Sequence, residues 1–180
     1  MSTTIRRGLL AAFALLLAFR APAGAESRDG WDVKHQRVKD FKLKDLQGRT
    51  LRSADLEGKI VVVDFWATWC GPCLKELPDL ATWYKKIADR PDVAFLSLNV
   101  TEDKAIAAAF VKEKNVEFPV YLGDDLLGPY EVSAFPTKLI LDMRALPGTL
   151  RFQREGYTAL KSLEARVEDA LAAKPEPAAR

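Results

Sequence analysis

The chain has 180 residues, of which 48% are hydrophobic, and carries 27 basic and 25 acidic residues with a single histidine. This length is enough for one ordinary domain with its own core. Three of the basic residues, Arg6, Arg7 and Arg20, lie in the first 25 residues, so the remaining chain is close to neutral. Such a balance speaks against nucleic acid or an anionic surface as the partner.

The first 25 residues have the pattern of a signal peptide. Arg6 and Arg7 form a positive start, and residues 8–19 form an apolar run of 12 residues. This run is shorter than the ~20 residues that a membrane-spanning helix needs. The small residues 23–25 then offer a cleavage site before Glu26. We therefore expect a cleaved signal peptide and a periplasmic or otherwise exported protein, with an uncleaved anchor as the alternative.

The chain after the signal divides into three parts. Residues 26–39 are polar and are expected to be a leader, and residues 174–180 a flexible tail. Residues 40–173 are expected to form the folded domain. Within it, alternation around a Gly48 turn predicts a β-hairpin over residues 41–52.

Strands and helices alternate along the rest of the domain. Residues 60–65 are apolar apart from Asp64, which predicts a strand in the centre of a sheet. A helix is predicted behind the cysteines, followed by a strand over residues 93–99. Thr101 is expected to cap the next helix, which should bury Ile106, Ala109 and Phe110. The remaining predicted elements are a short strand near 118–121, a short helix over 124–130, strands over 137–141 and 150–154, and a last helix over 160–171. This alternation predicts an α/β domain whose sheet is covered on its faces.

Cys70 and Cys73 are the only cysteines of the chain, and they directly follow the central strand. A strand that ends in two cysteines, with the second opening a helix, is typical of a dithiol–disulfide redox centre. Residues three apart at a helix start share one face, which brings the sulfurs within bonding reach. Unpaired N–H groups there stabilise negative charge, so we expect Cys70 to be the exposed attacking thiolate and Cys73 the shielded resolving thiol. A static bridge is the alternative.

The motifs resemble the thioredoxin superfamily and, within it, the TlpA/ResA-like branch of exported thiol–disulfide oxidoreductases. The resemblance covers roughly residues 39–171 and implies a thioredoxin-like fold, a central mixed sheet flanked by helices. It also implies an N-terminal β-hairpin and an inserted strand–helix element. The matching residues are Gly58-Lys59, Val63-Asp64-Phe65-Trp66-Ala67-Thr68-Trp69-Cys70-Gly71-Pro72-Cys73, Glu76-Leu77-Pro78, Phe118-Pro119-Val120, and Ala134-Phe135-Pro136-Thr137 running into Leu139-Ile140-Leu141-Asp142.

The resemblance also implies roles outside the cysteine pair. Pro136 would be a cis-proline beside it, and the backbone next to Pro136 would pair with an extended substrate strand. Phe135 is bulkier than the residue expected there, and Trp69 would form part of the surface around Cys70. We count Trp69, Phe135 and Pro136 as candidate substrate-binding residues; for Trp69, simple packing is an equal alternative.

Two acids are candidates for moving a proton to or from Cys73. Asp64 lies where thioredoxins carry a buried aspartate, and Glu76 where TlpA/ResA-like proteins carry a glutamate. An acid in an apolar strand is costly to bury without a purpose, which favours Asp64. A hydrogen-bonded structural acid remains the alternative for Asp64, and a solvated surface charge for Glu76.

These observations predict an enzyme, an exported thiol–disulfide oxidoreductase that acts mainly as a reductase. Gly71-Pro72 resembles reducing members of the family, and the substrates implied are disulfides of exported proteins such as apocytochrome c. A membrane thiol-reductant donor would keep the pair reduced. We expect a monomer without metal or cofactor. The alternatives are a Cu(I) chaperone that uses the two thiolates, and an oxidising or isomerising thioredoxin-like protein. A peroxidase is disfavoured by the paired cysteines.

Overall fold

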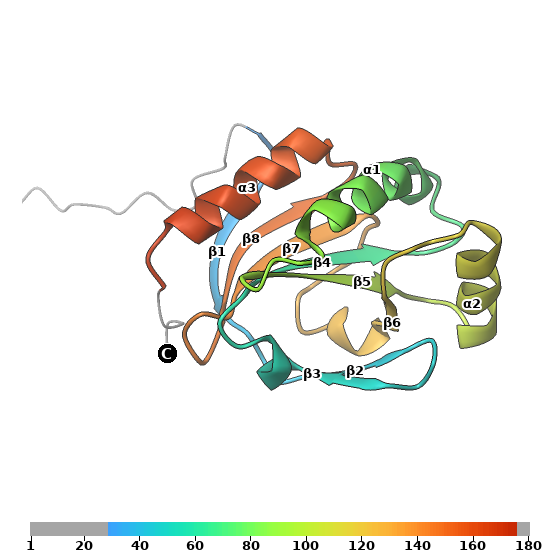
Figure 1. Ribbon diagram of the computed structural model, residues 1–180, viewed down its shortest axis with the longest axis horizontal. Coiled ribbons are helices and arrows are strands. Elements are labelled where there is room, and N and C mark those ends of the chain that lie inside the picture. The colour runs from blue at the N-terminus through green and yellow to red at the C-terminus, as the bar shows by residue number, and fades with distance from the viewer. Residues whose placement is uncertain (1–28, 176–180) are drawn as a thin grey trace, which may run out of the picture.

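A computed structural model describes residues 29–175, which form one eight-stranded sheet flanked by helices (Figure 1). The expected signal peptide and the end of the expected tail, residues 176–180, lie outside the described residues. In chain order the elements are β1 (Asp32–Arg37), β2 (Lys42–Asp45), β3 (Thr50–Arg52), the 3-10 turn η1 (Ser53–Leu56), β4 (Ile60–Trp66), α1 (Gly71–Ile87), β5 (Val93–Asn99), α2 (Lys104–Glu113), β6 (Val120–Leu122), the 3-10 turn η2 (Asp124–Leu126), β7 (Thr137–Asp142), β8 (Thr149–Glu155) and α3 (Leu160–Ala172).

Strand β4 lies in the middle of the sheet, whose order is β1-β8-β7-β4-β5-β6-β2-β3. It pairs in parallel with β5 and antiparallel with β7, so the sheet is mixed. All seven residues of β4 are buried, as expected for a nearly continuous apolar run with three consecutive valines. Trp66, the last residue of β4, lies four residues before Cys70, so the central strand leads directly into the redox motif.

Helices α1 and α3 cover the same face of the sheet, and the β2–β3 hairpin and the η2 segment lie toward the other (Figure 1). Alternation along β4 divides its side chains between two cores. Ile60, Val62 and Trp66 pack on the side of α1 and α3. Val61, Val63 and Phe65 pack on the opposite side with hairpin and η2 residues. The predicted hairpin and the inserted element, seen here as α2 followed by β6, are both present.

The polar segment expected to be a leader contains a strand instead. Residues Asp32–Arg37 form β1 and pair antiparallel with β8 at the edge of the sheet. Most β1 side chains are exposed, because an edge strand can satisfy its backbone while its side chains face water. Trp31 precedes the strand, is fully buried, and donates its Nε1–H to the Ser162 hydroxyl at 3.0 Å. The segment is therefore anchored to α3, a contact that its polar composition did not indicate.

Helix α2 differs from its prediction in start and in buried face. It begins at Lys104 after the N-cap Asp103, whereas Thr101 has a positive φ of 62°. Ile106 is 51% exposed, and Ala107 is the buried residue of the helix. Ala109 is also exposed, contrary to expectation. Figure 1 shows α2 beyond the ends of β5 and β6, so only a narrow stripe of the helix is covered.

The helix expected over residues 124–130 is reduced to the 3-10 turn η2. Among residues 29–175, no helix combines the length and apolar character that crossing a bilayer requires.

Replacing Trp31 with alanine tests whether the segment before β2 belongs to the fold. Loss of a fully buried tryptophan side chain should lower the free energy of unfolding by about 3–5 kcal/mol. Val33→Ala is the matched control on β1, because Val33 is 40% exposed, and it should cost no more than about 1 kcal/mol. Equilibrium unfolding in urea measures both variants. If both variants lower the free energy of unfolding equally and only slightly, the segment before β2 does not contribute to the stability of the fold.

Candidate redox site

Cys70 occupies the N-cap position of α1, where the chain leaves the central strand. Its backbone is extended, with φ −81° and ψ 97°, and its Sγ accepts the backbone N–H of Cys73 at 3.3 Å. Pro72 lies in the first helical turn, where a missing N–H costs nothing. The sulfurs of Cys70 and Cys73 are bonded at 2.02 Å. A helix start therefore points a backbone donor at the Cys70 sulfur, which favours negative charge on it.

Both cysteines are buried in this disulfide-bonded state. Cys70 is 4% exposed and Cys73 2%, so the prediction of an exposed Cys70 is wrong for the oxidised form. The reason is that the N-cap residue packs into the same core as Trp66 at the end of β4. Gly71, in contrast, is exposed, which leaves the motif open to solvent at the turn between the cysteines.

An aromatic pair lies beside the motif. The ring of Trp69 is 63% exposed and meets the edge of the Phe135 ring, with centroids 5.9 Å apart. The Phe135–Pro136 peptide bond is cis, as the family resemblance implies, and the Pro136 carbonyl accepts the Gly156 N–H at 2.7 Å. The residue before the proline therefore contacts the residue before Cys70. The roles of all three in binding substrate stay a prediction.

Asp64, Glu76 and Lys138 form a buried charged cluster on the α1 side of the sheet. Lys138 Nζ lies 3.0 Å from Asp64 Oδ1 and also forms an ion pair with Glu76 Oε2. The other Glu76 oxygen accepts the backbone N–H of Thr158. The Asp64 and Glu76 side chains are 2% exposed, and that of Lys138 is 0%. Glu76 is thus not the solvated surface charge that the sequence left open.

Burial and pairing shift the proton affinities within this cluster. Desolvation by burial raises the pKa of Glu76, against the attraction of Lys138 and with added repulsion from Asp64. For Lys138, desolvation pulls the pKa down, but the carboxylates of Asp64 and Glu76 outweigh it and the pKa is raised. Glu76 is therefore suited to hold a proton at a pH where an exposed glutamate has lost it.

Sequence reasoning missed two members of the cluster, Lys138 and Thr158. Lys138 follows Pro136-Thr137 and directly precedes the apolar run Leu139-Ile140-Leu141, and a charge at that point was a usable signal. Lys138 lies directly opposite Asp64 in the β4–β7 register. The partner of the buried Asp64 carboxylate is therefore on the neighbouring strand. Thr158 contributes only its backbone, and no side-chain pattern could have indicated it.

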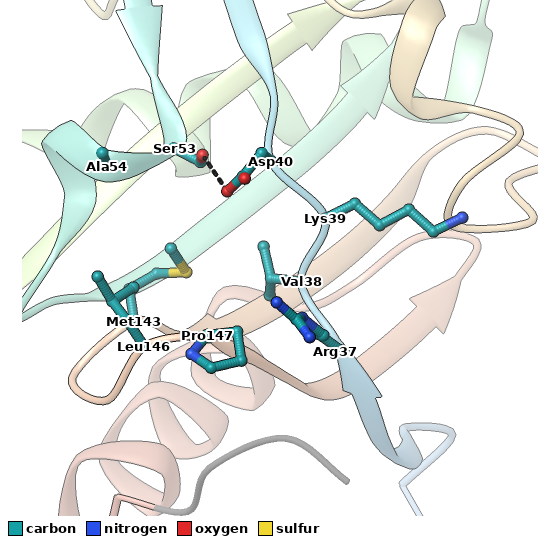
Figure 2. Close-up of a pocket in the computed structure, with 10 residues that line it drawn as sticks. Arg37, Val38, Lys39, Asp40, Ser53, Ala54, Met143, Leu146 and Pro147 are labelled. Carbon is teal, nitrogen blue, oxygen red and sulfur yellow. Dashed lines mark hydrogen bonds between the residues drawn. The ribbon is translucent and has the colours of Figure 1, made fainter. Parts of the chain in front are cut away.

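Two of the larger hollows in the described part of the chain lie outside this cluster. One, of about 530 Å³, adjoins Trp69 and is lined by Thr101, Glu102, Asp103, Ile106 and Asp124. The other, of about 490 Å³, is lined by residues 37–40, 53–54, 143 and 146–148 (Figure 2). Ile60 pairs with Asp142, so the second hollow lies near the start of β4, at the opposite end from the cysteines. Ser53 donates to Asp40 at its wall, and Lys39 points away from it (Figure 2).

Sequence comparison identifies the family. The AhpC/TSA family profile matches residues 35–156, which is more than half of the chain. The chain belongs to the AhpC/TSA family. Among curated proteins, it is 38% identical over 123 residues to the thiol-disulfide oxidoreductase ResA of Bacillus subtilis (strain 168), a match that covers 67% of this chain and 65% of that protein. It is 30% identical over 136 residues to ResA of Bacillus thuringiensis subsp. konkukian, covering 71% and 78%.

This chain matches less than two thirds of the length of the first relatives: 65% of ResA of Bacillus subtilis and 60% of ResA of Bacillus cereus.

Solved structures agree on the fold. A thioredoxin-family thiol:disulfide interchange protein of Chlorobium tepidum TLS superposes with a TM-score of 0.67 at 25% identity, over 78% of this chain and 99% of that one. The exposed lipoprotein thioredoxin of Streptococcus pneumoniae TIGR4 gives 0.65 at 28%, over 73% and 99%. The fold is thioredoxin-like, as the sequence motifs indicated.

The raised pKa of Glu76 makes a specific stability prediction. Because the folded state binds the Glu76 proton more tightly than the unfolded chain, this group stabilises the fold fully below its ordinary value of 4.5. That contribution is lost as the pH rises through the folded-state pKa. The free energy of unfolding of the wild type, relative to Glu76→Gln, should therefore fall as the pH rises above about 4.5. Urea unfolding of both proteins across pH 4–8 measures it, and an increase with pH would contradict the assignment.

Proposed function

We propose that this protein is an exported thiol–disulfide oxidoreductase that reduces disulfides of exported proteins through Cys70 and Cys73. The observation that carries the proposal is the Cys70–Cys73 bond at the start of α1, with a backbone N–H directed at the Cys70 sulfur. The names of the ResA relatives support the same activity. Residues 40–173, together with β1, are proposed to act as one domain.

The reaction proceeds in two exchanges. The Cys70 thiolate attacks a substrate disulfide, forms a Cys70–substrate bond, and releases the first substrate sulfur as a thiolate. Cys73 then loses its proton, attacks the Cys70 sulfur, and releases the second substrate thiolate, which takes up a proton. The substrate gains two electrons and the enzyme is left with the Cys70–Cys73 bond. A dithiol donor, proposed to be a membrane protein, returns the pair to the reduced state.

We infer the direction of electron transfer and the class of substrate from the residues around the two cysteines. Gly71-Pro72 supplies no cation between the cysteines, so the Cys70 thiolate is less strongly stabilised than in oxidising family members. A less stabilised thiolate favours reduction of the substrate. The exposed ring of Trp69, with Phe135 and Pro136, is proposed as the surface that receives an extended substrate segment. Apocytochrome c is a substrate of the proposed kind, and the enzyme is proposed to act as a monomer.

Trapping of the mixed disulfide tests the roles of the two cysteines. Reduced Cys73→Ser, mixed with a disulfide-bonded model peptide, should accumulate a covalent adduct at Cys70, because the resolving thiol is absent. Cys70→Ser is the matched variant and should trap almost nothing. Non-reducing gels and mass spectrometry of the adducts measure both. Equal trapping by the two variants would contradict the assignment.

Export is tested separately from chemistry. The full chain, expressed in a bacterium with a periplasm, should be recovered from the periplasmic fraction with Glu26 at its N-terminus. Intact-mass measurement of the recovered protein checks the cleavage site. Recovery of the full-length chain in the membrane fraction would favour an uncleaved anchor.

A further inference from the structure

Lys138 is a fully buried lysine that neither the cysteine motif nor the family resemblance uses. It lies on β7, two residues after the cis-proline Pro136. Its ammonium group joins Asp64 on β4 to Glu76 on α1. A buried lysine is rare unless it is paired, and here one ammonium serves two carboxylates. The lysine therefore connects the sheet to the helix that carries both cysteines.

The charges in this cluster do not balance. With all three groups ionised, two carboxylates face one ammonium and leave an excess negative charge that is shielded from water. Such a charge is costly, so Glu76 retains a proton more readily than an exposed glutamate does. The raised pKa of Glu76 agrees with this expectation. The proton affinity of Glu76 therefore depends on the single cation between the two carboxylates.

Polar and charged groups on the neighbouring elements have partners of their own. Arg154 lies opposite Lys138 in the β7–β8 register, and its guanidinium donates to the Asp29 and Tyr157 carbonyls. On α3, Glu164 pairs with Lys86 of α1 at 2.8 Å. From β5, the polar neighbour opposite Asp64 is Ser97, whose hydroxyl accepts the Trp66 indole N–H.

The position of the cluster links it to Cys73. Cys73 and Glu76 are three residues apart on α1 and therefore share one face of the helix. Both side chains are buried on that face. Asp64 is held by the sheet, since it pairs in register with Lys138 on β7 and with Ser97 on β5. A proton that leaves Cys73 thus has a buried carboxylate one helical turn away, and Lys138 fixes that carboxylate to the sheet.

We propose that Lys138 is a positioning residue of the redox centre, which keeps the Asp64–Glu76 pair available as a base for Cys73 near neutral pH. The inference rests on the proposed disulfide exchange. In the second exchange the Cys73 proton passes to the carboxylate pair, the Cys73–Cys70 bond forms, and the Cys70–substrate bond breaks with its electron pair on the leaving sulfur. Without Lys138, Glu76 holds its own proton to higher pH and becomes a poor base at neutrality.

A thiol reagent separates the two exchanges without a physiological substrate. Reduced protein treated with 5,5′-dithiobis(2-nitrobenzoate) should release one thionitrobenzoate as Cys70 attacks and a second as Cys73 displaces it. In Lys138→Met the second phase should move to higher pH by about one unit or more, which slows it about tenfold near pH 7. The first phase should change little. Lys138→Arg keeps the charge and should restore much of the rate, and Lys161→Met, an exposed lysine on α3, should match the wild type.

A second comparison, made in the absence of the Asp64 charge, covers the case in which Lys138→Met does not fold. Asp64→Asn leaves Glu76 with Lys138, whereas Asp64→Asn/Lys138→Met leaves Glu76 alone in a buried site. The second phase should have a higher pH midpoint in the double variant than in the single one. Equal midpoints in folded proteins would overturn the proposal, as would an unchanged pH profile in folded Lys138→Met.

The same traces distinguish this inference from the proposed function. If the wild type releases no second thionitrobenzoate, the exchange itself is refuted. If the wild type shows two phases and both Lys138 comparisons leave the second phase unchanged, the exchange stands and the role of Lys138 is refuted.

Discussion

A single ammonium group is shared by two carboxylates at a site closed to water, and this constraint ties together the central strand, its antiparallel neighbour and the helix that carries the cysteines. Asp64, Lys138 and Glu76 come from β4, β7 and α1. Removing one partner of a buried ion pair typically costs about 3–5 kcal/mol, because the remaining charge has no solvent to replace it. The burial of each charge therefore depends on the other two groups. Together they hold α1 against the sheet at Glu76, one helical turn after Cys73.

The start of α1 supplies the second requirement of the site. A helix N-terminus presents N–H groups without intrahelical partners, and the Cys70 sulfur accepts the one from Cys73. The Cys70 sulfur, which is proposed to carry the negative charge, therefore lies where the backbone favours charge. The Cys73 sulfur, which is proposed to resolve the mixed disulfide, belongs to a residue inside the helix rather than at its N-cap. The two thiols differ because of their places on one helix, and the charged cluster places the Glu76 carboxylate on the same helix face as Cys73.

Much of this arrangement could be predicted from local sequence. The apolar run with Asp64, the Cys70–Cys73 spacing and the helical spacing behind it gave the strand, the turn and the helix, because these elements depend on neighbouring residues. The cis Phe135–Pro136 bond came from the family resemblance and could not have come from composition. Glu76 remained ambiguous, because the burial of one helix face depends on what the sheet presents to it.

What the sequence could not supply depends on long-range pairing. Lys138 became significant only once β7 was placed beside β4 in register with Asp64. The strand β1 was missed because its side chains are mostly polar and its stability comes from hydrogen bonds to β8 and from Trp31 against α3. The burial of Ile106 was predicted wrongly because α2 lies beyond the ends of β5 and β6, where helical periodicity no longer indicates the buried face.

The reduction potential of the Cys70–Cys73 pair is the most direct measurement of whether this site is a reducing thiol–disulfide centre. Equilibration with glutathione or dithiothreitol buffers, followed by thiol alkylation and mass analysis, gives the oxidised fraction at each potential. We expect a reversible two-electron transition at a potential below about −200 mV, on the side of thioredoxin and the glutaredoxins. A pair that does not equilibrate with the buffer, or one that titrates near the roughly −120 mV of a strong oxidant, would contradict this assignment.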